Sequence, residues 1–320
     1  MMISVVVPCF NEELGLKAFY KNITEVLAYE GYRYEIILVN DGSKDLTKDI
    51  IIDLAHDDAH VKYISFSRNF GKEAAMLAGL RYASGDVMII IDADLQHPPS
   101  LIPEMVLGYE KGYDQVIAKR NRQGEAPLRK YYSQSFYKFI NYFVDVKLEN
   151  GAGDFRLLSR KAVDSLLELN EYNRFSKGLF SWIGFKEYII HYDNVLREHG
   201  ESKWSFSKLL NYGIDGIISF NNKPLRLAIY LGLMITSLSV IYIFAMLIRI
   251  FLYGIDVPGY FTTISAVLFL GGIQLTFMGM IGEYIGRIYY ETKQRPHYII
   301  EELNIEKAHI QKKEKANLYR

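Results

Sequence analysis

The chain has 320 residues with 37 Lys and Arg and 37 Asp and Glu, so no net charge draws it toward nucleic acid. Its single cysteine, Cys9, excludes an intrachain disulfide and fits a reducing compartment. Met1–Ser4 carries no Lys or Arg and the first apolar run stops at Pro8, so a signal peptide is not expected. We therefore expect the N-terminal part to stay in the cytoplasm.

Short apolar runs alternate with amphipathic stretches over residues 1–120. The predicted strands are Ile3–Val7, Glu35–Val39, Val61–Phe66, Val87–Ile91 and Gln115–Ala118. The predicted helices are Leu14–Tyr29, Leu46–His56, Gly71–Ala83 and Pro99–Lys111. This order predicts an α/β fold, a mostly parallel sheet with helices on both faces. Ligands bind such sheets beyond the carboxyl ends of the strands, and four polar clusters fall at those ends.

One cluster follows the fourth predicted strand and contains Asp92, Asp94 and Gln96. In an extended chain residues i and i+2 point to the same side, so both carboxylates would face one site. Adjacent carboxylates repel each other unless a cation lies between them. Carboxylate and amide oxygens suit Mg²⁺ or Mn²⁺ with a bound diphosphate, so this cluster predicts a metal site. The alternative is a solvated turn in which one Asp caps a helix.

The other three clusters are either structural or suited to a nucleotide. Asn11 and Glu12 could cap the following helix, and Asp41 could belong to a tight turn or accept hydrogen bonds from a ribose or base. Arg68 and Lys72 flank a glycine that opens a helix, a natural site for phosphate oxygens. The sequence has no G-x-G-x-x-G and no G-x-x-x-x-G-K-[ST], which argues against a dinucleotide dehydrogenase and a P-loop ATPase.

A cationic loop at residues 119–133 follows the last of these predicted strands. It holds five basic residues and one acidic residue, a composition that is usually a solvated charge run. Because it directly follows the predicted active-site edge, an anionic second substrate is the alternative. Further along, Asp154 opens an apolar, strand-like run. It could cap a helix, pair with Arg156 or be a third active-site carboxylate.

The last third of the chain is more apolar. Segments 227–248 and 261–282 contain no charged residue, and a helix over either would be about 33 Å long, which matches a bilayer core of about 30 Å. Two transmembrane helices are therefore predicted. The connector at 253–260 has no Lys or Arg while the flanks are basic, which predicts cytoplasmic ends. Residues 207–220 predict an amphipathic helix, and Gly282 and Gly286 have spacing suited to helix packing within or between chains.

Seven motifs occur in a specific order along the chain. They are Pro8-x-x-Asn11-Glu12, Asn40-Asp41-Gly42-Ser43, Ser67-Arg-Asn-Phe-Gly71-Lys72-Glu73, Asp92-Ala-Asp94-Leu-Gln96-His-Pro-Pro, Asp154-Phe-Arg, Gly200-Glu-Ser-Lys-Trp204, and Gly282-Glu-Tyr-Ile-Gly-Arg287 followed by Arg295-Pro296-x-Tyr298. Over essentially its whole length the chain resembles the family-two glycosyltransferases of GT-A fold. More narrowly it resembles polyprenyl-phosphate glycosyltransferases, the bactoprenol glucosyltransferases and dolichol-phosphate mannose synthases. The Q-x-x-R-W motif of processive members is missing, which argues against a polysaccharide synthase.

The resemblance implies a role for each matching position. Nucleotide-sugar-binding residues would be Pro8, Asn11, Glu12, Asp41, Arg68, Lys72 and Asp92. Asp92, Asp94 and Gln96 would hold Mg²⁺ or Mn²⁺, and Asp94 and Asp154 would be catalytic. The acceptor's phosphate would contact Arg120, Arg129 and Ser133, with Lys130 as an alternative to Arg129.

The resemblance also implies four parts: a GT-A domain at 1–204, an amphipathic interfacial helix at 205–224, a two-helix transmembrane domain at 225–288 and a cytoplasmic basic tail at 289–320. The expected partners are a nucleotide sugar, a polyprenyl phosphate lipid, the membrane and a second copy of the chain. The expected location is the cytoplasmic membrane, with the catalytic domain and both termini in the cytoplasm.

The expected reaction is inverting transfer from UDP-glucose to undecaprenyl phosphate, which gives a β-linked lipid-phosphate sugar for cell-envelope glycosylation. UDP-N-acetylglucosamine and GDP-mannose are alternative donors. Alternative functions are a membrane transport or flippase component that senses nucleotide, and a membrane-anchored nucleotidyltransferase.

Overall fold

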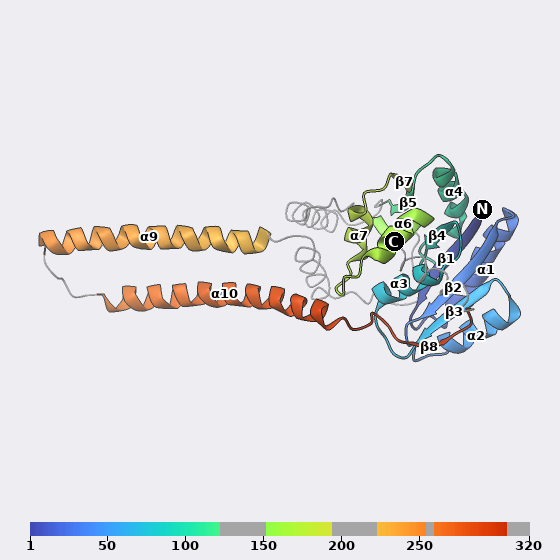
Figure 1. Ribbon diagram of the computed structural model, residues 1–320, viewed down its shortest axis with the longest axis horizontal. Coiled ribbons are helices and arrows are strands. Elements are labelled where there is room, and N and C mark those ends of the chain that lie inside the picture. Colours follow the sequence, from blue (N-terminus) through green and yellow to red (C-terminus); the bar gives the residue numbers. More distant parts are fainter. Residues whose placement is uncertain (122–151, 194–222, 254–258, 306–320) are drawn as a thin grey trace, which may run out of the picture.

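Within the described residues, one mixed sheet of eight strands forms the core of the part of the molecule drawn on the right in Figure 1. The computed structural model describes residues 1–121, 152–193, 223–253 and 259–305. Within them the strand order is β7-β5-β6-β4-β1-β2-β3-β8. The strands are β1 Met2–Cys9, β2 Arg33–Asn40, β3 Val61–Phe66, β4 Val87–Ile90, β5 Gln115–Arg120, β6 Ala152–Ser159, β7 Glu187–Tyr192 and β8 Ile300–Leu303. The helices are α1 Leu16–Tyr29, α2 Thr47–Asp57, α3 Lys72–Tyr82, η1 Pro99–Leu101, α4 Ile102–Glu110, α6 Arg160–Glu168, α7 Ser176–Trp182, α9 Lys223–Tyr253 and α10 Tyr260–Lys293.

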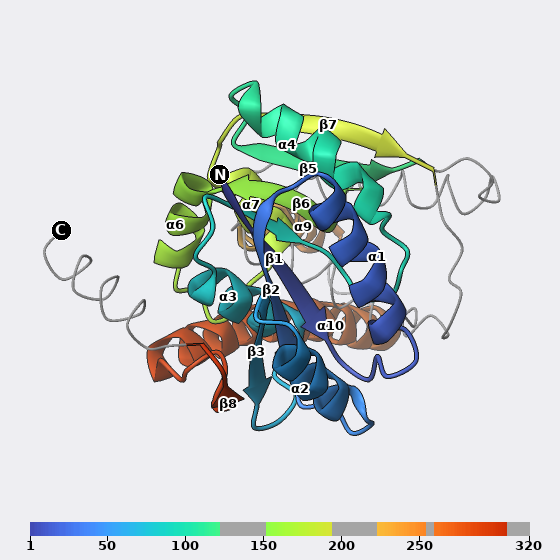
Figure 2. The ribbon, with the colours of Figure 1, turned by 90° about the vertical axis from the view of Figure 1, so that its right-hand side faces the viewer.

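Helices cover both faces of this sheet, as the strand–helix alternation predicted (Figure 2). On one face α1, α2 and α4 pack against alternate residues of β1 such as Val5. On the other face α3, α6 and α7 pack against residues of opposite alternation such as Val6. Both faces of the central strands are therefore apolar, which is why these strands appear in the sequence as continuous apolar runs.

Strand direction decides which residues meet at the ligand-binding edge. β1 pairs in parallel with β2 and β4, β2 with β3, and β5 with β7. β6 lies between β4 and β5 and is antiparallel to both. Its first residues, rather than its last, therefore lie where β4 and β5 end. This brings Asp154 to the carboxyl edge of the parallel strands, and the predicted mostly parallel α/β sheet is confirmed.

The C-terminal strand β8 was not predicted from the sequence. It pairs antiparallel with β3 at the sheet edge, although it follows β3 by more than two hundred residues (Figure 2). Lys48 Nζ lies 2.9 Å from a Glu301 carboxylate oxygen and 3.4 Å from one of Glu302, and the Tyr63 hydroxyl donates to Glu302 at 2.8 Å. Part of the segment expected to be a basic tail is thus an edge strand of the sheet.

Helices α9 and α10 run side by side and project away from the sheet (Figure 1). Over the residues that the structure describes, no helix combines the length and hydropathy needed to cross a membrane. This finding contradicts the predicted multi-pass location in the cytoplasmic membrane and leaves the two transmembrane helices unconfirmed.

The Gly282 and Gly286 spacing does not serve packing inside the described part of the chain. A Cβ added at either glycine would meet no atom within 4 Å. Packing between chains through these glycines stays a prediction. The predicted amphipathic helix at 207–220 lies outside the described residues.

Tyr298 docks the segment between α10 and β8 onto the sheet. Its ring stacks on Phe66 with the centroids 4.9 Å apart, and the Arg81 guanidinium lies 5.9 Å from its centroid. We expect Tyr298→Ala to lower the free energy of unfolding by about 1–3 kcal/mol, because it removes a half-buried aromatic side chain. Urea unfolding followed by circular dichroism measures this. Tyr298→Phe is the control, and equal stability of the two variants would contradict the docking role.

Candidate active site

Lys72 joins two carboxylates that are far apart in the sequence. Its Nζ lies 2.7 and 2.9 Å from the two carboxylate oxygens of Asp92 and 2.6 Å from Asp154 Oδ2. Lys72 is the first residue of α3, Asp92 follows β4, and Asp154 is near the start of β6. Gly71, with φ +98°, makes the sharp entry into α3 that a residue with a Cβ would resist. The predicted edge therefore holds a cation between two anions.

The charges of this cluster stabilise one another. Burial would lower the pKa of the Lys72 ammonium, but Asp154 and Asp92 outweigh it and raise that pKa above its ordinary value. Burial would raise the pKa of the Asp92 carboxyl, but Lys72 and His97 lower it well below its usual range. The pKa of Asp154 is also lowered, since Lys72 and Lys177 outweigh its burial. All three groups of the Lys72 cluster, namely Lys72, Asp92 and Asp154, are thus charged at neutral pH.

His97 contacts Asp92, and Tyr192 contacts His97. Neither residue was assigned a role from the sequence. His97 is buried, with Nε2 3.6 Å from Asp92 Oδ2 and Nδ1 2.7 Å from the Tyr192 hydroxyl. Tyr192 ends β7, so this contact depends on the pairing of β7 with β5. The order His97-Pro98-Pro99 was visible in the sequence, but its tertiary partner was not.

Asp94 and Gln96 lie in a tight turn rather than in an extended chain. β4 ends at Ile90, and Leu95 has the left-handed φ of +58° that non-glycine residues rarely adopt. The Gln96 backbone N–H donates to Asp94 Oδ1 at 3.2 Å, and Gln96 Oε1 accepts from Arg120 at 3.0 Å. The extended-chain premise of the alternation argument is therefore wrong, whereas the expectation that both carboxylates face one site stays a prediction.

The oxygen donors of this turn fit a hard divalent cation. Asp92, Asp94 and Gln96 offer two carboxylates and one amide oxygen, the ligand types that Mg²⁺ and Mn²⁺ take together with phosphate oxygens. Among the described residues no three His, Cys, Asp or Glu side chains form a group that could hold a metal. A cation here would therefore depend on the amide oxygen and on oxygens from a bound diphosphate.

The predicted nucleotide residues lie on the loops after β1, β2 and β3. Asp41 is buried and accepts hydrogen bonds from the backbone N–H groups of Phe70 at 2.6 Å and Gly71 at 2.9 Å. Burial raises the pKa of its carboxyl, although these hydrogen bonds and Arg68 oppose the rise. Gly42 packs so closely on the Arg68 backbone that a Cβ there would clash. Asp41 thus joins the loop after β2 to the loop before α3.

Asn11 connects the loop after β1 to the loop after β2 by hydrogen bonds. Its N–H donates to Ser43 Oγ at 3.1 Å, and its Oδ1 accepts from the Lys44 N–H at 2.9 Å. The Glu12 N–H donates to Thr47 Oγ1 at 2.8 Å. The Asn11 side chain therefore connects loops and does not cap α1. The Glu12 carbonyl does accept at the start of α1, from the N–H groups of Gly15 at 3.1 Å and Leu16 at 3.0 Å.

Other predicted residues lie apart from the Lys72 cluster or outside the described residues. Pro8 lies near the end of β1, paired with Val39. The exposed Arg68 lies over the Phe70 ring, 4.1 Å from its centroid. Arg120 ends β5 and reaches Gln96. The predicted acceptor residues Arg129, Lys130 and Ser133 lie outside the described residues.

Glu73 is a further residue of this region that was quoted in a motif without a role. Its carboxylate accepts hydrogen bonds from the Ser176 N–H at 3.2 and 3.3 Å and from the Ser176 hydroxyl. Burial and the charge of Asp154 raise the pKa of Glu73 to about 7, although the hydrogen bonds from Ser176 oppose this. No local sequence signal could have paired residues 73 and 176.

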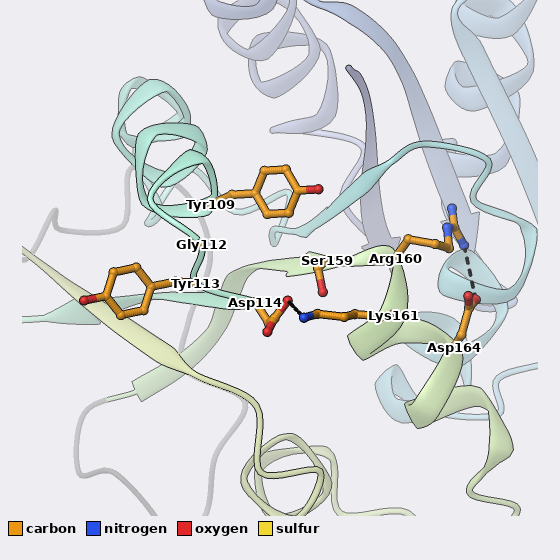
Figure 3. A pocket seen from close by; sticks show the side chains of 8 residues that line it. All are labelled: Tyr109, Gly112, Tyr113, Asp114, Ser159, Arg160, Lys161 and Asp164. Atoms are coloured by element: carbon orange, nitrogen blue, oxygen red, sulfur yellow. Dashed lines mark ion pairs between the residues drawn. The ribbon is translucent and has the colours of Figure 1, made fainter.

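A pocket of about 500 Å³ lies elsewhere, at the opposite edge of the sheet (Figure 3). It is lined by Tyr109, Gly112, Tyr113, Asp114, Ser159, Arg160, Lys161 and Asp164. Its charges pair with each other: Lys161 lies 2.9 Å from Asp114, and Arg160 lies 3.8 Å from Asp164. None of the predicted site residues lines this pocket.

Two family models match the chain. The model described as "Glycosyl transferase family 2" matches residues 4–167, about half of the chain, and the one described as "GtrB C-terminal hairpin" matches residues 223–288. The first spans β1 to α6 and so includes Lys72, Asp92 and Asp154. The second covers most of α9 and α10.

Two named relatives point the same way. A Bacillus subtilis (strain 168) protein, CsbB, named among the glycosyltransferases, is 58% identical over 95% of this chain and 92% of its own. The bactoprenol glucosyl transferase of Shigella phage SfV is 45% identical over 94% of this chain and 98% of its own. Glucosyl-3-phosphoglycerate synthase of Mycobacterium tuberculosis, solved with Mn²⁺, UDP-glucose and phosphoglyceric acid, is 20% identical, with a TM-score of 0.46 over 68% of this chain and 77% of that chain. By the family match and the identity to these relatives, the protein is a glycosyltransferase of family two.

Proposed function

We propose that this glycosyltransferase moves glucose from UDP-glucose to the phosphate of a polyprenyl lipid. The observation that carries the proposal is the Lys72 cluster at the carboxyl edge of the sheet, with Arg120 beside Gln96 next to it. The printed name of the phage relative, bactoprenol glucosyl transferase, supports both the sugar and the lipid acceptor.

The donor would lie across the loops after β1, β2 and β3, with its diphosphate at Asp92, Asp94 and Gln96. A bound Mg²⁺ or Mn²⁺ held by these oxygens would offset negative charge on the leaving diphosphate. Lys72 holds Asp92 and Asp154 ionised and fixed in direction before substrate arrives. Such preorganised charges need little rearrangement during the reaction.

The acceptor supplies its own nucleophile. A phosphate monoester is mostly doubly ionised at pH 7, since its second pKa is about 6. A phosphate oxygen forms the new bond to the anomeric carbon while the bond to the diphosphate breaks and the diphosphate leaves with the electron pair. Asp154 then needs only to orient the acceptor or the sugar hydroxyls, and no strong general base is required.

Attack from the face opposite the leaving group inverts the anomeric carbon, as in single-displacement glycoside chemistry. An α-linked donor would therefore give a β-linked lipid-phosphate sugar. Incubation with labelled UDP-glucose, UDP-N-acetylglucosamine and GDP-mannose, together with purified polyprenyl phosphate, tests donor and acceptor. We expect UDP release matched by glucosylated lipid of β configuration. Pyrophosphate release would instead indicate nucleotidyl transfer and would overturn the proposal.

Arg120 and Arg129 are proposed to hold the acceptor's phosphate. Neutralising both in Arg120→Gln/Arg129→Gln should raise the KM for polyprenyl phosphate at least about 10-fold, because each charge-assisted hydrogen bond contributes about 1.5–3 kcal/mol. The KM for nucleotide sugar should change much less. Arg33→Gln, on an exposed arginine at the start of β2, is the control. An unchanged lipid KM in the double variant would remove the acceptor role.

A further inference from the structure

The first two residues of α3 point toward different elements of the fold. Successive helix residues are about 100° apart around the helix axis, since a turn takes about 3.6 residues. Lys72 faces Asp92 and Asp154, whereas Glu73 faces Ser176, the first residue of α7. The start of α3 therefore contacts both the carboxylates and a second helix.

Glu73 takes the place of a missing helix cap. The first N–H groups of a helix have no partner within it and need an acceptor from elsewhere. At α7 the preceding residue, Phe175, provides no side-chain cap. The Glu73 carboxylate instead accepts from both the N–H and the hydroxyl of Ser176. Ser176 is only 5% exposed, so water competes little for this contact.

The next residue of α7 is Lys177, which acts on Asp154. Its positive charge adds to that of Lys72 in lowering the pKa of the Asp154 carboxyl. Asp154 and Arg174, which precedes α7, are the charged groups that act on Glu73 itself. Arg174 is held in turn, since it donates to the Leu169 carbonyl at 2.5 Å. The start of α7 thus carries a charge that acts on the same carboxylate as Lys72.

We propose that Glu73 is a positioning residue that, by capping α7 from the first turn of α3, holds the start of α3 so that Lys72 stays on Asp92 and Asp154. The Lys72 ammonium is then fixed on two carboxylates at the point where two phosphorylated substrates meet. This role rests on the proposed function and goes beyond it, because Glu73 does not belong to the predicted site. A misplacement of about 1 Å in such a site can cost about 100-fold in rate, so the cap should appear in kcat.

The test compares four variants in steady-state transfer assays. Glu73→Ala should lower kcat about 10- to 100-fold while the KM for nucleotide sugar changes less than about twofold. Ser176→Ala should also lower kcat, by a smaller factor. The double variant should be no slower than Glu73→Ala, because Glu73→Ala and Ser176→Ala remove the same contact. Glu73→Gln keeps an acceptor oxygen and should recover most of the rate.

Glu35 supplies a matched control. Its carboxylate accepts from the Ser84 N–H at 2.7 Å and the Ser84 hydroxyl at 2.8 Å, the same kind of contact, but at the opposite edge of the sheet. Glu35→Ala should lose stability with kcat unchanged. The proposal is overturned if Glu73→Ala keeps its kcat, or if Ser176→Ala and Glu73→Ala add independently. If Glu73→Ala does not fold, Ser176→Ala and Glu73→Gln decide by the same criteria.

Amide hydrogen exchange separates this proposal from the proposed function. If the wild-type chain transfers no sugar to polyprenyl phosphate, the acceptor assignment fails. The cap is then decided by exchange of the N–H groups at residues 176–178, which should be faster in Glu73→Ala than in Glu35→Ala. Equal exchange in the two variants would overturn the cap regardless of activity.

Discussion

Asp94→Asn is expected to reduce sugar transfer at least about 1000-fold, which corresponds to about 4 kcal/mol of transition-state stabilisation. Asn keeps the size of Asp94 and can still accept the Gln96 N–H, so the turn should persist. What it loses is the negative charge proposed to hold the divalent cation against the leaving diphosphate. Initial rates with labelled nucleotide sugar and purified polyprenyl phosphate measure the effect, with circular dichroism to check the fold.

Asp86→Asn is the matched control for this substitution. Asp86 precedes β4 at the opposite edge of the sheet and accepts from the Met2 N–H at 2.7 Å. Its replacement should leave the rate within about twofold, since surface changes far from a site have small effects. Wild-type activity should also stop on chelation and return with Mg²⁺ or Mn²⁺. A rate for Asp94→Asn within about tenfold of wild type would reject the metal role.

Lys72→Met is expected to damage both activity and stability. It removes a cation that lies within 3 Å of both Asp92 and Asp154, and leaves two facing carboxylates. Removing one partner from a buried charge cluster costs about 3–5 kcal/mol, and the partial exposure of this cluster reduces the expected loss to about 1–3 kcal/mol at pH 7. Transfer should fall about 100- to 1000-fold, because the remaining carboxylates would repel substrate phosphates.

The stability that Lys72→Met loses relative to wild type should increase with pH. In the wild type, the lowered pKa values of Asp92 and Asp154 stabilise the fold above the unfolded pKa of about 3.9, and this contribution is lost as pH falls through the folded values. In Lys72→Met, burial and mutual repulsion should raise the pKa of the pair. The folded state then binds more protons than the unfolded state, so its stability falls as pH rises from about 4.

Urea unfolding at several pH values between 4.5 and 7.5 measures the difference, which should grow toward neutral pH. The control is Lys48→Met, because the Lys48 ammonium also lies between two carboxylates, Glu301 and Glu302, but at the β8 edge. Lys48→Met should have wild-type activity and no comparable change with pH. Parallel pH curves for Lys72→Met and wild type would show that the carboxylates do not depend on Lys72.

The strand and helix order of the first 120 residues could be predicted from the sequence because its cause is local. Buried parallel strands need apolar runs and the helices between them need one apolar face, and both patterns repeat over a few residues. Val61–Phe66 was predicted with the bounds that β3 has. The polar clusters at the strand ends were likewise visible, and parallel pairing made their convergence predictable.

The partners within the site were decided by tertiary structure. Lys72 was predicted to bind phosphate, but it holds Asp92 and Asp154 because β6 inserts antiparallel beside β4. The contacts of His97 with Tyr192 and of Glu73 with Ser176 span about a hundred residues each. β8 joins β3 across a still longer interval. Sequence periodicity records which face of an element is buried, but not which distant element covers it, since many pairings bury the same apolar area. Only the folded sheet selects one, and with it the charge cluster at its edge.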